Sequence, residues 1–247
     1  DKHAVYVAMA EIRRRNLEPV SPSSPINLSV AELKVFSQNG EDGIIAELVR
    51  CLPVESRYFV EFGVEDGTEC NTRLLSEVFG WSGLYLEPDA AAYKKLSSRW
   101  SGSETVAVAQ ETVTPGNVAE LFQRHQVPEI LGLLSIDVDG QDYWIWEALP
   151  ARYRPAIVVI ECNTSYRPGI SRVEERGLGW TAQHSDTFGA SIEALDLLGQ
   201  SRGYSLVHVD LAGVNAFFVR HDLLQGRNVN GVTTRYPNYD LRGYRHP

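Results

Sequence analysis

The sequence has few cysteines, no long apolar run and no surplus of basic charge. Its three cysteines, Cys51, Cys70 and Cys162, cannot all pair and show no Cys-x-x-Cys spacing, so we interpret them as buried thiols in a reducing compartment. No apolar run approaches the ~20 residues that a membrane-spanning helix requires. The chain, which starts at Asp1, also lacks the basic, apolar and small-residue order of a signal peptide. We expect a cytoplasmic protein with no membrane contact.

The charge balance bounds the choice of partner. The formal net charge is −9 over 247 residues. A protein that binds nucleic acid through its phosphates needs a basic surface, so a nucleic-acid partner is not expected. With 43% hydrophobic residues the chain is long enough for one sizeable α/β core.

Two parts of unequal length are expected. Residues 1–18 alternate apolar and basic positions, which predicts a short amphipathic helix, and prolines among serines in 19–25 then indicate a linker. We expect this first part to cover residues 1–35 and the main domain to cover residues 36–247. The helix is interpreted as a lid or as a packing element of a homodimer.

Apolar runs of strand length alternate with helical stretches from about residue 40 onward. This alternation predicts parallel strands joined by right-handed crossovers. The last two runs are separated by only residues 210–213, so they should form an antiparallel hairpin. The expected fold is α/β and Rossmann-like, a seven-stranded and mostly parallel sheet with an antiparallel C-terminal hairpin and helices on both faces. The runs are 57–62, 83–87, 104–109, 131–137, 156–161, 204–209 and 214–219.

An acidic glycine turn follows the first run. Glu61 ends the run, Gly63 and Gly67 follow it, and the second run ends on Glu87 twenty residues later. In a doubly wound sheet these strand ends lie side by side, so glycine lets the backbone approach a ligand while Glu87 accepts hydrogen bonds from a ribose. The spacing predicts an adenosine-containing cofactor.

The charge of the same turn selects among such cofactors. A pyrophosphate is usually held by glycines at a helix N-terminus, without acidic side chains nearby. Four carboxylates in this turn would repel a pyrophosphate but attract a sulfonium and an amino group. We therefore expect S-adenosylmethionine rather than a dinucleotide. The four carboxylates are Glu61, Glu65, Asp66 and Glu69.

Five motifs occur in a fixed order: FSQNGED at 36–42, EFG at 61–63, CNTRLL at 70–75, GWSGLYLEP at 80–88 and SIDVDG at 135–140. Together they resemble the FkbM-like group of class I S-adenosylmethionine-dependent methyltransferases over about residues 36–220. The resemblance implies the class I methyltransferase fold, and it places Gln38 and Asn71 in the cofactor pocket. It also implies methylation of a hydroxyl or amine group of a small polar acceptor, such as a sugar or a glycosylated natural product, and we expect O-methylation rather than N-methylation.

Further cofactor contacts are expected at the remaining strand ends. Gln110 and Glu111 follow the third run, where the adenine edge should lie, and Asp137 ends the fourth run, where it should meet the cofactor amino group. Other interpretations stay open. Solvated turn residues would give the same pattern, Gln38 also fits a helix cap, and Glu87 also fits a surface carboxylate before a helix.

Carboxylates gather at the ends of the fourth and fifth runs. Asp137 and Asp139 should face Glu161 and Asn163, because adjacent strands are only ~4.8 Å apart. Carboxylates this close repel one another unless a cation such as Mg²⁺ neutralises them. The arrangement resembles the metal site of catechol and macrolide-sugar O-methyltransferases. In the alternative interpretation, Asp139 and Gly140 form a tight turn, Asp142 caps the next helix and Asp137 binds the cofactor amino group.

Acceptor deprotonation calls for a base. Asp139 and His184 are the expected catalytic residues, whereas His208 lies within a run and is expected to be structural. The segment 164–186 is rich in aromatic and arginine side chains and is predicted to bind the acceptor, with a mobile surface loop as the alternative.

Two other functions stay open. A metal-dependent glycosyltransferase would use the Asp-x-Asp at 137–139 to hold a metal and a nucleotide sugar, but it leaves Glu61, Gly63 and Glu87 unexplained. A cofactor-binding protein that has lost catalysis and serves as an interaction partner is the second.

Overall fold

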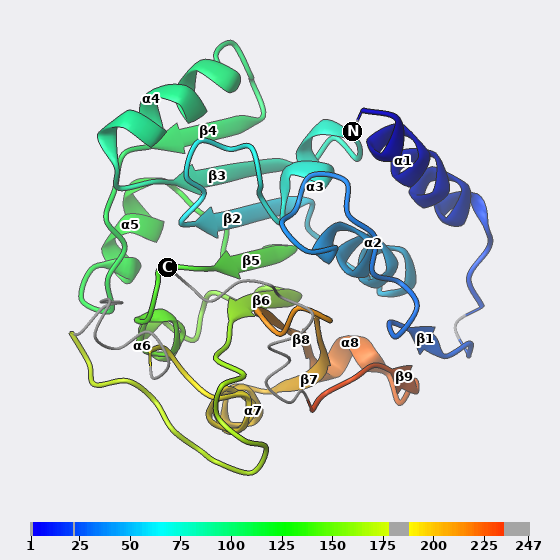
Figure 1. The fold of residues 1–247 in the computed structure, drawn as a ribbon. Helices are drawn as coiled ribbons and strands as arrows, with labels where there is room; N and C mark the ends of the chain where they lie inside the picture. Colours follow the sequence, from blue (N-terminus) through cyan, green and yellow to red (C-terminus); the bar gives the residue numbers. More distant parts are fainter. Residues whose placement is uncertain (1, 22, 178–187, 235–247) are drawn as a thin grey trace.

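The computed structural model describes residues 2–21, 23–177 and 188–234 of the chain (Figure 1). Seven strands form its central sheet, and each of the seven apolar runs is one of these strands, with bounds that differ by two residues at most. The predicted strands are confirmed. They are β2 Tyr58–Phe62, β3 Ser82–Leu86, β4 Val106–Ala109, β5 Leu133–Ile136, β6 Ile157–Glu161, β7 Tyr204–Val209 and β8 Asn215–Arg220.

The order of the strands identifies the fold. Across the sheet it is β4-β3-β2-β5-β6-β8-β7. The pairs from β4 to β6 are parallel, and β8 runs antiparallel to both β6 and β7. The predicted hairpin is therefore present, and its second arm, β8, inserts between β6 and β7. This is the Rossmann-like class I methyltransferase fold, which confirms the fold class expected from the sequence.

Helices cover both faces of the sheet (Figure 1). Successive side chains of a strand point to opposite faces, so neighbours such as Phe59 and Val60 are buried in different cores. One core includes α5 Val118–Arg124, α6 Asp142–Ala148 and α7 Ile192–Ser201. The other includes α2 Glu41–Cys51, α3 Arg73–Glu77 and α4 Ala90–Arg99.

The N-terminal segment packs along the main domain. Helix α1 Lys2–Leu17 buries Ala8 and Ile12 in a small core that it shares with α2 and α3. Strand β1 Ile26–Asn27 then pairs in parallel with β9 Val229–Asn230, which follows α8 His221–Leu224. Residues 26–27 are thus paired with residues 229–230.

His208 in β7 makes hydrogen bonds to residues that follow β1 and β9. Its side chain is fully buried, Nδ1 accepts a hydrogen bond from the backbone N–H of Val232 at 3.0 Å, and Nε2 lies 3.0 Å from Glu32 Oε1. Because a backbone N–H can only donate, Nδ1 carries no proton and Nε2–H donates to Glu32. This is the structural role expected for His208.

Within the described ranges, no helix is long enough and apolar enough to cross a membrane.

Candidate functional site

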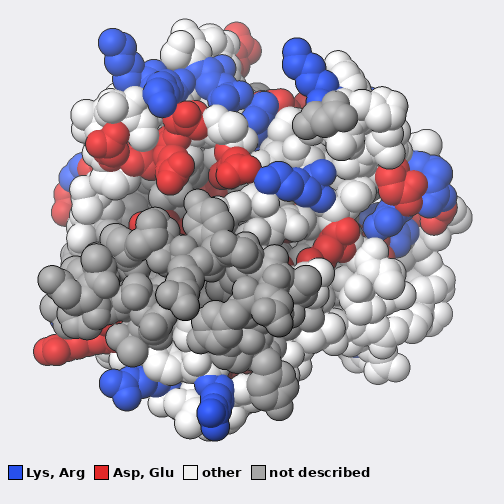
Figure 2. All heavy atoms as spheres, viewed as in Figure 1, with Lys and Arg blue, Asp and Glu red and all other residues white. Residues whose placement is uncertain are grey.

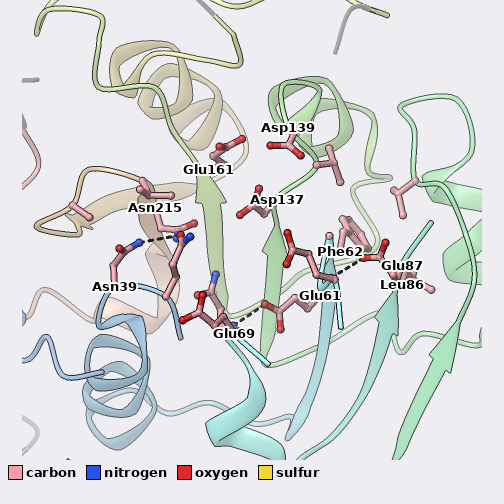
Figure 3. Close-up of a pocket in the computed structure, with 18 of the residues that line it drawn as sticks. Asn39, Glu61, Phe62, Glu69, Leu86, Glu87, Asp137, Asp139, Glu161 and Asn215 are labelled. Atoms are coloured by element: carbon pink, nitrogen blue, oxygen red, sulfur yellow. Dashed lines mark hydrogen bonds between the residues drawn. The ribbon is translucent and has the colours of Figure 1, made fainter. Parts of the chain in front are cut away.

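A cavity of about 860 Å³ opens at the carboxyl ends of the strands, where the strand order reverses between β2 and β5 (Figure 3). Ligands bind at such a switch point in open α/β sheets. Figure 2 shows acidic side chains gathered on the face onto which these strand ends open. Among the described lining residues, carboxylates far outnumber the single lysine, Lys34, so the cavity favours cationic groups. The carboxylates are Glu32, Glu61, Glu65, Glu69, Glu87, Glu111, Asp137, Asp139 and Glu161.

Glu61 at the end of β2 holds the loop that follows it. One carboxylate oxygen accepts the N–H of Asn71 at 2.8 Å, and the other accepts the N–H and the hydroxyl of Thr72 at 3.1 and 2.5 Å. Burial raises the pKa of Glu61 to about 7, although these hydrogen bonds favour the charged form. Asn71 in turn donates to Ser135 Oγ at 3.1 Å and lines the cavity. Glu61 therefore positions Asn71, one of the predicted cofactor residues.

Gly63 brings this loop against the end of β5. Its φ is +66°, and a Cβ at this position would lie 1.7 Å from the backbone oxygen of Asp137. A side chain of any size would separate the two strand ends, so glycine is required by contact as well as by conformation.

Glu87 at the end of β3 is joined to the same turn. Its carboxylate is buried and accepts the N–H of Glu65 at 2.7 Å and the N–H of Asp89 at 2.8 Å. A carboxylate oxygen has two lone pairs, so Glu87 can accept further hydrogen bonds from a ligand in the cavity. Asp89 caps α4 by accepting from the N–H groups of Ala91 and Ala92.

The two residues predicted beside the adenine differ in position. Glu111 lines the cavity and pairs with Arg124 at 2.8 Å. Gln110 is exposed, donates to the backbone oxygen of Pro88 at 3.3 Å and is not among the lining residues.

Lysines from distant parts of the chain pair with half of the acidic turn. Lys34 lies 2.8 Å from Glu69, and Lys95 lies 3.5 Å from Asp66. Both pairs are exposed, so they contribute little to stability. They do reduce the net negative charge of the turn. Glu61 and Glu65 are the two carboxylates of the turn that line the cavity and form neither of these ion pairs.

The FSQNGED motif forms a loop held by its own last two residues. One oxygen of Asp42 accepts three backbone N–H groups, of Val35, Phe36 and Ser37, at 2.7–2.8 Å, and also the Ser37 hydroxyl at 2.7 Å. Burial raises the pKa of Asp42 to about 6. This bracing aims Gln38 at the cavity, which it lines as an exposed side chain.

Three carboxylates meet beyond the ends of β5 and β6. Oxygen atoms of Asp137, Asp139 and Glu161 all lie within 4.8 Å of one another (Figure 3). Burial raises the pKa of Asp137 and of Glu161 well above the ordinary values, and neighbouring carboxylates add to both shifts. Glu161 Oε2 is buried without a hydrogen-bond partner. An unpartnered oxygen beside two other carboxylates fits a hard divalent cation with oxygen ligands.

Asp142 differs from the helix cap of the alternative interpretation, although the tight turn of that interpretation is present. It is the first residue of α6, and the N-cap residue Gln141 makes no side-chain cap. The Asp142 carboxylate instead accepts the N–H groups of Val138 at 2.8 Å and Gly140 at 2.9 Å. It thereby fixes the tight turn in which Asp139 takes a φ of +55°.

The sequence suggests that Asn163 lines the cavity, but Asn215 lines it instead. Asn163 is buried, donates to the backbone oxygen of Phe188 at 2.9 Å, accepts the N–H of Ser165 at 2.8 Å and is not among the lining residues. Asn215 lines the cavity instead, directly opposite Glu161 in the β6–β8 ladder. Sequence reasoning missed Asn215 because only the insertion of β8 next to β6 brings it there.

The predicted base His184 lies outside the described residues. The described part of the predicted acceptor loop, residues 164–177, is fastened to the domain. Val173 bridges Ala190, and Trp144 donates to the backbone oxygen of Glu174 at 2.8 Å.

Several solved structures resemble this fold at low sequence identity. The N-terminal domain of EvdMO1 with SAH bound is 15% identical, with a TM-score of 0.48 and coverage of 85% of this chain and 94% of that chain. A SAM-dependent methyltransferase from Aquifex aeolicus is 12% identical, with a TM-score of 0.43 and coverage of 85% and 98%. A putative sarcosine dimethylglycine methyltransferase from Galdieria sulphuraria is 13% identical, with a TM-score of 0.45 and coverage of 67% and 62%.

No protein-family model matches the chain, and no curated protein sequence matches it. The superpositions are partial, with TM-scores below 0.5. The assignment of the class I methyltransferase fold therefore rests on the order and directions of the strands.

Proposed function

We propose that the protein is an S-adenosylmethionine-dependent methyltransferase of the FkbM-like type. The observation that carries this proposal is the meeting of Gly63, Glu87 and Asp137 around one acidic cavity, at the switch point of a class I methyltransferase sheet. These residues lie at three adjacent strand ends. Glu87 can accept hydrogen bonds from a ribose, Gly63 lets the backbone approach a ligand closely, and Asp137 offers a carboxylate to an amino group. This combination favours a cationic adenosine cofactor.

Each strand end takes one part of the cofactor. Glu87 accepts hydrogen bonds from the ribose hydroxyls, and Glu111 lies at the adenine end of the cavity. The turn at Gly63 and the loop residues Gln38 and Asn71 surround the amino-acid portion, whose ammonium group is neutralised by Asp137 when no cation is bound there. Glu61 acts through Asn71, because its own oxygens are taken up by the loop.

The acceptor occupies the part of the cavity beyond Asp137, beside Asp139 and Glu161. A small hydroxylated molecule, such as a sugar or a glycosylated natural product, suits a wall of carboxylates because hydroxyl groups donate to them. Bound S-adenosylmethionine supplies an electrophilic methyl group, which an in-line acceptor oxygen takes as the sulfonium becomes a thioether. Asp139, or His184, accepts the proton that the acceptor hydroxyl loses. O-methylation is therefore proposed over N-methylation.

A divalent cation such as Mg²⁺ fits the carboxylates of Asp137, Asp139 and Glu161. Bound there, it would lower the pKa of an acceptor hydroxyl and orient it. The fit rests on the mutual distances of the three oxygens and on the unpartnered Glu161 Oε2.

Calorimetric titration of the purified protein with S-adenosylhomocysteine, a UDP-sugar and NAD tests the proposal. We expect S-adenosylhomocysteine to bind and the other two not to bind. Binding of the UDP-sugar alone would replace the proposal with the glycosyltransferase. Binding of S-adenosylhomocysteine without methyl transfer to any of a panel of sugars and glycosides would favour the cofactor-binding interaction protein. The cytoplasmic location and the homodimer stay predictions of the sequence.

A further inference from the structure

Asn215, the first residue of β8, has a buried oxygen with no partner. The side chain is 3% exposed and lines the cavity, yet its Oδ1 makes no hydrogen bond. Its amide nitrogen donates to Glu41 Oε1 at 2.9 Å. If the amide oxygen and nitrogen were exchanged, Oδ1 would face the Glu41 oxygen and two acceptors would repel each other. The hydrogen bond therefore assigns Nδ2 to the side of Glu41 and Oδ1 to the opposite side.

A second unpartnered oxygen belongs to the residue opposite. Asn215 and Glu161 are direct partners in the antiparallel β6–β8 ladder, so their side chains leave the same face of the sheet, with Cβ atoms ~5 Å apart. Glu161 is 5% exposed and its Oε2 also lacks a partner. Two buried acceptors without a donor, on facing residues of paired strands that line one cavity, call for a positive group in that cavity, either a metal ion or a proton on Glu161.

The surrounding carboxylates favour the metal ion. Asp137 and Asp139 each bring an oxygen within 4.8 Å of the Glu161 carboxylate. Oxygen ligands lie ~2.0–2.6 Å from Mg²⁺ or Ca²⁺, so ligand atoms on opposite sides of such an ion are ~4–5 Å apart. One proton neutralises one of three carboxylates, whereas a divalent ion attracts all three at once.

We propose that Asn215 Oδ1 is a protein ligand of a divalent cation that Asp137, Asp139 and Glu161 also bind. This inference rests on the metal-assisted form of the proposed function, and it assigns the amide ligand to β8 in place of Asn163. Glu41 is a positioning residue, since it orients the Asn215 amide while its other oxygen accepts the N–H groups of Asn39 and Gly40 at 2.8 Å. Four oxygen ligands leave open positions on a six-coordinate ion for a hydroxylated acceptor or water.

Binding of Mn²⁺ alone, followed by electron paramagnetic resonance of the free ion, tests the assignment. Asn215→Leu has a similar volume but no oxygen, and we expect it to weaken Mn²⁺ binding by at least ~10-fold. The double variant Glu41→Gln/Asn215→Asp moves the amide to position 41 and the carboxylate to position 215. It keeps the hydrogen bond between the two side chains and adds charge at the ligand, so it should bind Mn²⁺ at least as tightly as the wild type.

Each outcome decides the assignment. Mn²⁺ binding that is unchanged in Asn215→Leu would overturn it, as would a double variant that binds at least ~10-fold more weakly than the wild type. If Asn215→Leu does not fold, the double variant decides alone. A wild-type protein that binds no Mn²⁺ at millimolar concentration would also overturn it and would assign the positive group to a proton shared by Glu161 and Asn215. Titration of the same samples with S-adenosylhomocysteine tests the methyltransferase proposal separately. A failure of the cation site can therefore be distinguished from a failure of cofactor binding.

Discussion

Gly63 and Asp137 touch through their backbones at the point where β2 and β5 diverge, and a Cβ on Gly63 would lie 1.7 Å from the Asp137 carbonyl oxygen. The contact joins the glycine turn to the strand end that carries the carboxylate cluster. The glycine turn and the carboxylate cluster are therefore positioned relative to each other by this backbone contact.

Gly63→Ala should destabilise the protein and weaken binding of S-adenosylhomocysteine. Gly80→Ala is the matched control, because Gly80 has almost the same φ, +67°, but open space around its Cβ position. We expect Gly80→Ala to cost ~1–2 kcal/mol of unfolding free energy from backbone strain alone. Gly63→Ala should cost at least ~2 kcal/mol more from overpacking. Urea denaturation measures both, and equal costs would contradict the close contact.

Glu87→Ala should weaken S-adenosylhomocysteine binding by at least ~10-fold, or ~1.5 kcal/mol, because it removes a charge-assisted hydrogen-bond acceptor from the ribose. Glu129→Ala is a control at an exposed carboxylate that does not line the cavity. Calorimetry compares the two variants with the wild type. Unchanged affinity in Glu87→Ala would remove Glu87 from the cofactor site.

Glu61 should make the stability of the fold depend on pH. Burial raises its pKa from an ordinary value of 4.5 to about 7, so the folded state binds the proton more tightly than the unfolded state. The stability that this proton contributes is fully present below pH ~4.5 and is lost as the pH rises through about 7. Glu61→Gln does not titrate, so the unfolding free energy of the wild type should fall relative to the variant by up to ~3 kcal/mol between pH 4.5 and 7.5.

Urea unfolding of the two proteins at several pH values gives this difference directly. The pKa of Asp210 is also raised by burial, but this residue is present in both proteins and its effect cancels. A difference that stays constant with pH would contradict the raised pKa of Glu61.

Asp139→Asn should lower turnover by ~100-fold while leaving S-adenosylhomocysteine affinity unchanged, if Asp139 is the base that takes the acceptor proton. His184→Ala gives the parallel test of the other candidate, which lies outside the described residues. Steady-state rates with an identified acceptor, measured for both variants, assign the role. Normal turnover in Asp139→Asn would remove Asp139 as the base and leave His184 as the candidate.

Local sequence patterns were sufficient to predict the sheet. Each apolar run of strand length became a strand, because a segment buried on both faces needs continuous apolar side chains wherever it lies in the fold. The gap of four residues between the last two apolar runs, 210–213, likewise left only a hairpin, and in the structure residues 210–214 join these two strands. The carboxylates at the carboxyl ends of β2, β3, β5 and β6 could be placed at one edge, since parallel strands share their carboxyl ends.

Partners across long sequence separations could not be predicted. Lys34 and Glu69, which form an ion pair, are 35 residues apart, and no periodicity indicates that they meet. Gln110, predicted beside the cavity, instead donates a hydrogen bond to the Pro88 backbone oxygen. An exposed side chain after a short strand can bind a nearby backbone acceptor, and the sequence does not indicate which one.

The strands, the hairpin and the strand ends at which the acidic residues gather could all be predicted from the sequence, because they follow from local alternation and from chain direction. Tertiary structure decided which amide faces the cluster. β8 inserts between β6 and β7, which sets Asn215 opposite Glu161, while the loop after β6 takes up both polar atoms of Asn163. The physical reason is that strand order is a property of the whole core, since pairing β8 with β6 depends on the helices packed over both faces, and no single segment encodes it.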